Sequence, residues 1–498
     1  MNRVVVIGSG ISGLTGAILL HRLGREVLIL EQQPQAGGAL HRFRRGGIPF
    51  DVGFHYTGGL GEGEILRTIW RYCGVDADIT PIPFPEEGGD RISVNGFPDI
   101  RAPFSYERFA GELKRHFPAE QGGIDSFFRT IRSHADANPF YNPSRPLGEF
   151  LQQLAFPEEH TLGDLIRSCT SDPVLQAALS HPVFLHGVRP DDIGLAMHTS
   201  VAHPVYSGMY AVDGGGQAIA DAFLRRLETL GVVVRRGVEV TEIRTENGRV
   251  TGVAAGEEFF PCTDVVYTGH PALLPGLVED DALRKVYRDR LREMTNTPSM
   301  FLAFGAVERS EHDPRLDWNN FYALPPGLDF PSDNEPVKDK WLFLSGCGLR
   351  DSALTPENDP GQAVILMRPA SWRETQTFDR GRKLRASGYR EWKEGESRKL
   401  IEEAERLWNG LLKGFRLINA ASPLTFRDEL KYVRGAVYGV RHSTDQFAVG
   451  SRTRVAGLWL SGQSTLMCGI LGASLSALIT VGTMTDLESL WRKVRSSA

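Results

Sequence analysis

The sequence predicts an α/β protein in which a nucleotide-binding domain is divided into three segments, with an α+β domain interleaved between them. Two observations lead to this prediction. A short apolar strand, a glycine-rich turn and a helix stand at the N-terminus, and similar strand and helix patterns return only near residue 205 and near residue 430. The chain has 498 residues, which is enough for two or three domains with large cores.

The N-terminal motif occupies residues 4–31. Residues 4–7 are apolar and β-branched, as expected for a buried parallel strand. An apolar helical face follows a turn with the spacing G-x-G-x-x-G, formed by Gly8, Gly10 and Gly13. The second expected strand, residues 26–30, ends at Glu31. Strand, glycine turn, helix and acid in this order are the context of a Rossmann-like dinucleotide site.

Each part of the motif has a physical task. The glycines allow a tight turn, a close approach of the backbone to a pyrophosphate, and close contact between helix and strand. The N-terminus of the helix offers free N–H groups and a positive dipole end to phosphates. Glu31 can accept hydrogen bonds from ribose hydroxyls and would repel a 2′-phosphate. The motif alone does not choose between FAD and NAD.

Composition and cysteine spacing disfavour several other classes of protein. The net charge is -5, from 56 basic and 61 acidic residues, which does not indicate a nucleic-acid partner. The five cysteines are scattered and never have C-x-x-C spacing, so we expect reduced thiols and no metal site. No signal peptide is recognisable, and we expect a cytoplasmic protein.

One uncharged stretch near the C-terminus could be either a membrane-spanning helix or a buried helix. Residues 455–485 contain neither an acid nor a base, and residues 466–484 are long enough to span a bilayer. Glycines, a glutamine and hydroxyl side chains interrupt this run, however. We therefore expect a buried helix whose glycine-rich start meets a cofactor, and a protein that contacts a membrane at most peripherally.

The order of the patterns defines the expected domains. Residues 1–60, 205–275 and 430–498 are assigned to the nucleotide-binding domain. The substrate-binding domain, with a helical cap, is expected from residues 61–204 and 276–429, which are aromatic-rich and mixed in pattern. We expect, among other elements, a helix over 218–230 and a strand over 238–243 in the nucleotide-binding domain, and a charged helix over 396–412 in the substrate-binding domain. Such interleaving suits a cofactor that lies between two domains.

Five segments of the chain carry a resemblance to a known protein family. It resembles the FAD-dependent phytoene desaturase, carotenoid isomerase and retinol saturase family, and is most similar to the saturase-like branch. The resemblance covers most of the chain and is specific in the opening motif with Glu31, Gly37-Gly38 followed by FDVGFHYTG, Asp213-Gly214-Gly215, SPLTFRDEL…RGAVYG (422–439), and GLWLSGQSTLMCGILGA (457–473). In the third segment Ala211-Val212-Asp213 replaces the aromatic-Pro-Arg stretch usual in relatives. The implied fold is a discontinuous, GR2-type FAD-binding domain.

The resemblance also implies which residues hold the cofactor, a non-covalently bound FAD. The pyrophosphate would lie against Gly8, Gly10, Ser12 and Gly13. Glu31 would hold the adenosine ribose beside Gln32, and the main chain of Val240 would meet the adenine edge. Gly38 and Ala39 would approach the pyrophosphate and the flavin.

The last of the five segments would close the site around the flavin. Gly462 and Gln463 would lie at the phosphate and ribityl end. Ile470 and Leu471 would offer main-chain N–H groups near the pyrimidine ring, at the start of the last long helix. A helix N-terminus at that position stabilises negative charge on a reduced flavin.

A bound flavin can give or take hydride, so the protein has to supply a substrate channel and at most one proton donor. The candidates are His55 and Tyr56, which follow the expected strand 48–53, and Tyr438 in the AVYG segment. His55 has an alternative interpretation as a hydrogen-bonded structural histidine. Tyr438 can equally be a wall of the pocket.

The function implied by the resemblance is that of an FAD-dependent oxidoreductase acting on carbon–carbon double bonds. It would saturate, desaturate or isomerise a long lipophilic polyene, isoprenoid or unsaturated acyl chain. One alternative is a flavin amine oxidase with an aromatic cage beside the flavin. Another is a non-catalytic escort protein that binds prenyl groups or lipids, which the intact phosphate loop and Glu31 disfavour. No motif identifies the electron donor or acceptor.

Overall fold

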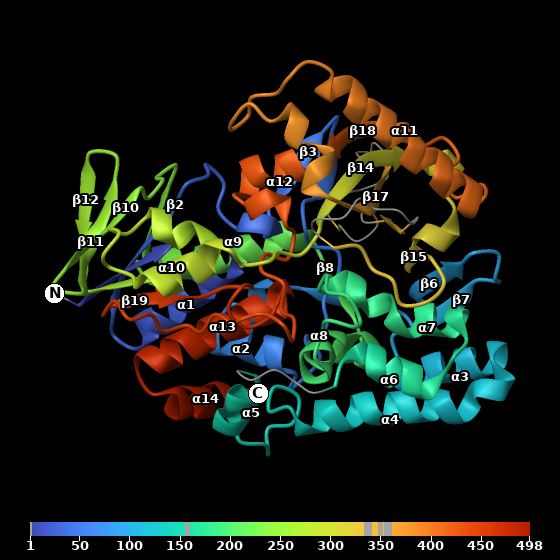
Figure 1. The fold of residues 1–498 in the computed structure, drawn as a ribbon, viewed down its shortest axis with the longest axis horizontal. Coiled ribbons are helices and arrows are strands. Elements are labelled where there is room, and N and C mark those ends of the chain that lie inside the picture. Colours follow the sequence, from blue (N-terminus) through green and yellow to red (C-terminus); the bar gives the residue numbers. More distant parts are fainter. Residues whose placement is uncertain (1, 155–159, 333–340, 347–351, 353–360) are drawn as a thin grey trace.

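The computed structural model describes residues 2–154, 160–332, 341–346, 352 and 361–498. Two large sheets organise this part of the chain. In Figure 1 the strands of the first sheet lie on the left, those of the second lie at the upper right, and a group of helices fills the lower right. The functional cavity lies where these parts meet.

The first sheet is five-stranded, parallel, and ordered β19-β13-β1-β2-β9. Its central strand is apolar on both faces, and Val4, Val5 and Val6 are fully buried, as expected for a parallel sheet covered on both sides. The strands are β1 (Arg3–Ile7), β2 (Glu26–Glu31), β9 (Val233–Arg236), β13 (Asp264–Tyr267) and β19 (Leu458–Leu460). They come from three distant segments, which confirms the discontinuous Rossmann-like fold.

Helices and a small sheet cover the two faces of this sheet. Helices α1 and α13 lie against each other on one side, and the three-stranded sheet covers the other (Figure 1). The helices are α1 (Ile11–Arg22), α2 (Ile65–Cys73), α9 (Gly215–Thr229), α13 (Gly469–Met484) and α14 (Leu487–Arg495), and the small strands are β10 (Glu242–Glu246), β11 (Arg249–Ala255) and β12 (Glu258–Pro261). Most of α13 is buried, which explains its lack of charge. None of the helices described is long and apolar enough to cross a bilayer.

The second sheet has seven strands in the order β18-β14-β17-β16-β15-β6-β7. All neighbours are antiparallel except β15 and β6, which run parallel. Its strands are β6 (Gly89–Val94), β7 (Ile100–Pro103), β14 (Ser299–Val307), β15 (Asn319–Leu324), β16 (Leu342–Gly346), β17 (Gln362–Ala370) and β18 (Arg416–Ala421). This sheet therefore draws on the two stretches assigned to the substrate-binding domain, although the domain boundaries themselves stay a prediction.

Helices cover both faces of the second sheet. One face lies on α11 (Tyr389–Leu407), and the other lies on the helical group. That group contains α3 (Tyr106–His116), α4 (Gln121–Ala137), α6 (Leu162–Cys169), α7 (Pro173–Ser180), the short helix η4 (His181–Leu185) and α8 (Leu195–Ser207). Helix α5 (Leu147–Leu154) instead packs beside α14, in the core of the helices of the first sheet (Figure 1). The hairpin of β3 (Arg42–Arg45) and β4 (Ile48–Asp51) leads from the first sheet toward the second.

Three expected elements have other bounds in the structure. Residues 238–241 are not a strand: the Val238 N–H donates to the Glu31 carbonyl oxygen (2.8 Å), and β10 begins only at Glu242. The charged helix begins at Tyr389, and Trp392 in its first turn packs on Phe301 of the sheet, with ring centroids 5.7 Å apart. It ends at Leu407, before the expected residue 412. Helix α9 begins at Gly215, three residues earlier than expected.

Candidate functional site

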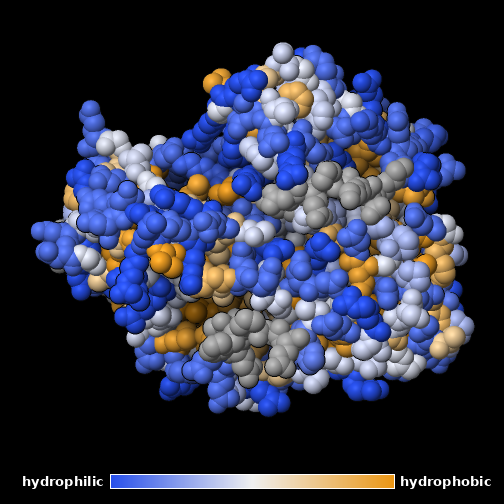
Figure 2. All heavy atoms as spheres, viewed as in Figure 1, coloured by the Kyte–Doolittle hydropathy of each residue, from blue (hydrophilic) through white to orange (hydrophobic). Residues whose placement is uncertain are grey.

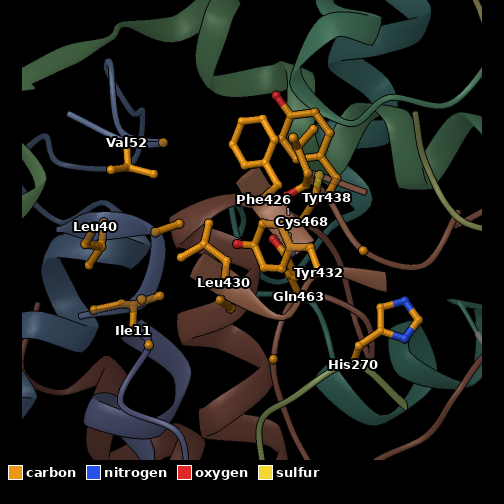
Figure 3. Close-up of a pocket in the computed structure, with 18 of the residues that line it drawn as sticks. Ile11, Leu40, Val52, His270, Phe426, Leu430, Tyr432, Tyr438, Gln463 and Cys468 are labelled. Carbon is orange, nitrogen blue, oxygen red and sulfur yellow. Dashed lines mark hydrogen bonds between the residues drawn. The ribbon is translucent and has the colours of Figure 1, made fainter. Parts of the chain in front are cut away.

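A cavity of about 950 Å³ extends from the glycine-rich loop of the first sheet to the second sheet. It is lined by every predicted cofactor residue except Gly13, and by the three candidate catalytic residues His55, Tyr56 and Tyr438. In Figure 3, Ile11, Leu40 and Val52 stand on one side of this cavity, and Tyr432, Tyr438, Gln463 and Cys468 stand on another. The lining residues predicted from the sequence thus come together from segments hundreds of residues apart.

The glycine loop has the geometry that the motif requires. Gly8 has φ +102°, and a Cβ there would lie 2.5 Å from Thr268 Oγ1. A Cβ on Gly10 would meet no protein atom within 4 Å, so its backbone stays accessible from the cavity. Gly13 differs, because a Cβ there would lie 2.1 Å from the Gly8 carbonyl oxygen. Gly13 therefore serves the contact between α1 and the loop, whereas Gly8 and Gly10 face the ligand side.

The Glu31 carboxylate holds this loop in place. It is 6% exposed and accepts hydrogen bonds from Ser9 N (2.9 Å), Ser9 Oγ (2.7 Å) and Gln33 N (2.8 Å). A carboxylate offers about four acceptor positions, so capacity remains for ribose hydroxyls. Next to it, the buried Gln32 Oε1 has no hydrogen-bond partner within the part of the chain described. These groups fit an adenosine ribose.

The Gly37-Gly38 doublet brings a second backbone segment against the glycine loop. Both residues have positive φ values, +118° and +57°. The Gly37 N–H donates to the Ser9 carbonyl oxygen (3.1 Å), and a Cβ on Gly38 would lie 3.2 Å from Gly10 Cα. Side chains would separate the two loops, which explains why this doublet consists of glycines.

The third segment closes the cavity from the opposite side. Ser12 and Ser461 share a hydroxyl hydrogen bond of 2.7 Å, which connects α1 to the loop after β19. The Gly462 N–H donates to Ser476 Oγ of α13 (2.9 Å). Helix α13 starts at Gly469 without a side-chain cap, and Ile470 and Leu471 in its first turn line the cavity. Free N–H groups and a positive dipole end therefore face the site.

The F-D-x-G segment contains an acid whose main contacts are structural. Asp51 is 4% exposed, and its carboxylate accepts from Arg42 Nη2 (2.9 Å) and from the Gly216 N–H (3.0 Å) at the start of α9. A Cβ on Gly215 would collide with both side chains of this ion pair. Asp51 thus ties the β3–β4 hairpin to α9, and the Gly214-Gly215-Gly216 run leaves room for that contact.

The far end of the cavity is an aromatic chamber, defined here by the lining residues Tyr56, Phe184, Tyr322, Phe343, Phe426 and Tyr438. The Tyr322 ring lies 4.9 Å from Phe343 and 5.4 Å from Phe184, measured between centroids. Met300, Leu302 and Met367 complete the apolar wall. Sequence reasoning missed Tyr322 and Phe343, which belong to ordinary apolar strands (β15 and β16) with no motif around them.

The candidate catalytic residues make different contacts in the chamber. The Tyr56 and Tyr322 hydroxyls are hydrogen-bonded at 2.7 Å. The Tyr438 hydroxyl donates to the Phe184 carbonyl oxygen (2.7 Å), and burial raises its pKa above the ordinary range. The His55 ring lies 5.8 Å from the Phe343 ring. Their catalytic roles stay a prediction.

Cys468, at the N-cap of α13, is a protonated thiol in this arrangement. Its Sγ donates to the Leu185 carbonyl oxygen (3.3 Å). Burial raises the pKa of the thiol to about 12, so the thiolate is scarce at neutral pH. A protonated thiol is a poor nucleophile, which agrees with the expected non-covalent cofactor.

Comparison with known proteins agrees with this geometry. The family of flavin containing amine oxidoreductases matches residues 11–306, more than half of the chain. All-trans-retinol 13,14-reductase of Danio rerio is 25% identical, over 96% of this chain and 85% of its own. The human protein of the same name is 25% identical, with 99% and 88% covered. The chloroplastic prolycopene isomerase of Daucus carota is also 25% identical, with 92% and 76% covered.

Solved structures show the same fold. An oxidoreductase from Methanosarcina mazei superposes with a TM-score of 0.67 at 18% identity, covering 96% of this chain and 99% of its own. Cyclohexylamine oxidase from Brevibacterium oxydans gives 0.59 at 15% identity, with 97% and 99% covered. The predicted fold, the FAD cofactor and the predicted resemblance are thereby confirmed. The chain belongs to the flavin containing amine oxidoreductase family, as an FAD-dependent oxidoreductase similar to retinol saturases and carotenoid isomerases.

Proposed function

We propose that this protein acts on carbon–carbon double bonds of a long lipophilic polyene, isoprenoid or unsaturated acyl chain. The reaction would be a saturation, a desaturation or an isomerisation. The observation that carries the proposal is the apolar chamber at the end of the cavity opposite the nucleotide loop. The names of the relatives, retinol reductases and prolycopene isomerases, support the same substrate class.

The chamber suits such a substrate because its wall is aromatic and aliphatic. Phe184, Tyr322 and Phe343 are each less than 5% exposed, and Met300 and Leu302 are equally buried. Apolar surface of this kind gains roughly 25 cal/mol per Å² when it covers a hydrocarbon chain.

Three charged residues of the cavity wall lie outside the chamber. Lys431 and Arg382 both pair with Glu239, one residue from Val238, whose N–H is bound to Glu31. These charges therefore belong to the nucleotide end. The residues that define the aromatic chamber include no Asp or Glu.

The apolar character of the chamber favours a hydrocarbon substrate over an amine, the substrate of the alternative enzyme, a flavin amine oxidase. An amine substrate would bring a cation or a polar nitrogen into the chamber, where burial without a partner is costly. Tyrosine rings could form a cage around such a group, so an amine oxidase is the alternative to test. A non-catalytic escort protein is disfavoured by the match to a flavin-containing family.

The test uses purified protein that has been reduced without oxygen. All-trans-retinol, a carotenoid, an unsaturated fatty acid and a set of primary amines are added in turn, and flavin reoxidation is followed by absorbance. We expect reoxidation with a polyene and a product changed by two hydrogens, or an isomer with no net reoxidation. Amine-dependent peroxide release from the oxidised protein, with no reaction of any polyene, would replace the proposal by the amine oxidase.

We further infer a cytoplasmic protein that meets membranes only peripherally, because its substrate would be stored in lipid. Flotation with liposomes tests this inference. Reversible binding that increases with vesicle concentration supports it, whereas complete absence of binding contradicts the peripheral contact.

A further inference from the structure

The hydroxyl pair of Tyr56 and Tyr322 is a buried polar feature in an otherwise apolar wall. The two oxygens lie 2.7 Å apart, and either can be the donor. Tyr56 follows the β3–β4 hairpin, whereas Tyr322 belongs to β15 of the second sheet. The pair therefore spans the junction between the cofactor side and the substrate side of the cavity.

Two other groups of the cavity wall with a transferable hydrogen donate to backbone carbonyl oxygens. The Tyr438 hydroxyl donates to the Phe184 carbonyl oxygen, and the Cys468 thiol donates to the Leu185 carbonyl oxygen. A carbonyl oxygen cannot return a hydrogen, so these bonds hold the two donors in fixed orientations. In the Tyr56–Tyr322 pair the partner is itself a donor, which permits a proton to leave one oxygen while the other compensates.

Tyr322 is suited to the compensating role. It is 2% exposed, and its ring is fixed by Phe343, Phe184 and His181. Burial, together with the charge of Asp90 on the neighbouring strand β6, raises its pKa well above the ordinary value. Tyr322 thus keeps its proton and can donate a hydrogen bond to a phenolate on Tyr56.

We propose that Tyr56, with Tyr322 as its hydrogen-bond partner, exchanges a proton with the substrate carbon next to the one that exchanges hydride with the flavin. This inference rests on the proposed function. In the reducing direction a bound reduced flavin would supply hydride to one carbon of the double bond, and Tyr56 gives its proton to the neighbouring carbon as the π bond is consumed. The resulting phenolate accepts a hydrogen bond from Tyr322 until a solvent proton restores it. Desaturation is the same step in reverse.

The test compares Tyr56→Phe and Tyr322→Phe with wild type in a single turnover of the reduced enzyme with all-trans-retinol or a carotenoid. Loss of a general acid slows such a step by about 10²–10⁴-fold, and we expect this range for Tyr56→Phe. Tyr322→Phe removes one hydrogen bond to the phenolate and should slow the step by about 10–100-fold. Tyr389→Phe is the matched control, because its hydroxyl bonds Ser422 Oγ (2.6 Å) away from the cavity.

Two further readouts separate chemistry from folding. FAD content and the affinity of the oxidised enzyme for the same polyene, measured by the shift of the flavin spectrum, should be unchanged in both variants. A single-turnover rate equal to that of wild type in Tyr56→Phe overturns the inference and leaves the proposed function standing. So does a rate slower by about 10²–10⁴-fold in His55→Asn when Tyr56→Phe is not slowed. A wild-type enzyme that reacts with no polyene overturns both.

Discussion

The nucleotide end and the aromatic chamber of the cavity differ in the kind of residue that builds them. At the nucleotide end, backbone groups and a single carboxylate hold the loops, as in the bonds from Ser9 and Gln33 to Glu31. In the chamber, side chains from β15, β16, η4 and the segment after the β3–β4 hairpin meet ring against ring. We therefore expect stability and FAD binding to be sensitive to backbone changes at the nucleotide end and less sensitive to side-chain changes in the chamber.

The largest effect is expected from adding one methyl group at the nucleotide end. Gly13→Ala places a Cβ 2.1 Å from the Gly8 carbonyl oxygen, so α1 has to move away from the loop. We expect the free energy of unfolding to fall by more than about 3 kcal/mol, and we expect the variant to lose its bound FAD. Gly16→Ala in the same helix is the control, because its Cβ would lie at an ordinary 3.8 Å from Ala477 Cβ. Melting temperature and flavin absorbance per protein measure both variants.

A second prediction concerns acid stability on the substrate side. Burial lowers the pKa of His198 to about 3 and that of His203 to about 4, and both lie on α8. Unfolded histidines titrate near pH 6.5, so below that pH the unfolded state binds more protons and stability falls. Each histidine contributes a loss of up to about 1.4 kcal/mol per pH unit between pH 6.5 and its folded value.

Urea midpoints measured from pH 7 to pH 4.5 check this slope. His203→Gln should flatten it by about one proton, although the variant also loses the bond between His203 and the Tyr106 hydroxyl. An unchanged slope in that variant would show that His203 does not contribute to the acid sensitivity of this side.

A third prediction addresses the carboxylate that holds the glycine loop. Glu31→Gln replaces one acceptor oxygen by an NH₂ group, which cannot accept from Ser9 N or Gln33 N. Bonds to a charged acceptor contribute about 1.5–3 kcal/mol, so we expect FAD affinity to fall by about 10–100-fold. Glu26→Gln, at the exposed start of β2, should bind FAD as wild type does. Equal affinities for both variants would contradict a role of Glu31 in FAD binding.

The smallest effect is expected for Tyr438→Phe in the chamber. The change leaves the buried Phe184 carbonyl oxygen without the Tyr438 hydrogen bond and should cost about 1–2 kcal/mol. FAD should remain bound, because no backbone has to move. A rate reduced by 100-fold or more with an unchanged melting temperature would instead identify Tyr438 as the proton donor.

Much of the nucleotide end could be predicted from local patterns. The spacing of Gly8, Gly10 and Gly13, the acid at position 31 and the Gly37-Gly38 doublet each have a backbone reason that is visible in the sequence. The packing task of Gly13, where a Cβ would lie 2.1 Å from the Gly8 carbonyl oxygen, agrees with the predicted close contact between helix and strand. That Gly13 does not line the cavity appears only in the structure. So does the bond from Gly216 to Asp51, since 165 residues separate the two.

The sequence alone was enough for the α/β class and the discontinuous nucleotide-binding fold, because glycine spacing and hydrophobic period are local properties of a chain. The FAD cofactor followed from the resemblance to a flavin-dependent family, since the glycine motif does not choose between FAD and NAD. The chamber required the folded molecule. Tyr322 faces Tyr56 because β15 pairs with β6 in parallel register and the β3–β4 hairpin reaches that sheet. Such contacts depend on which strands become neighbours, and long-range strand pairing leaves no signature in either partner read separately.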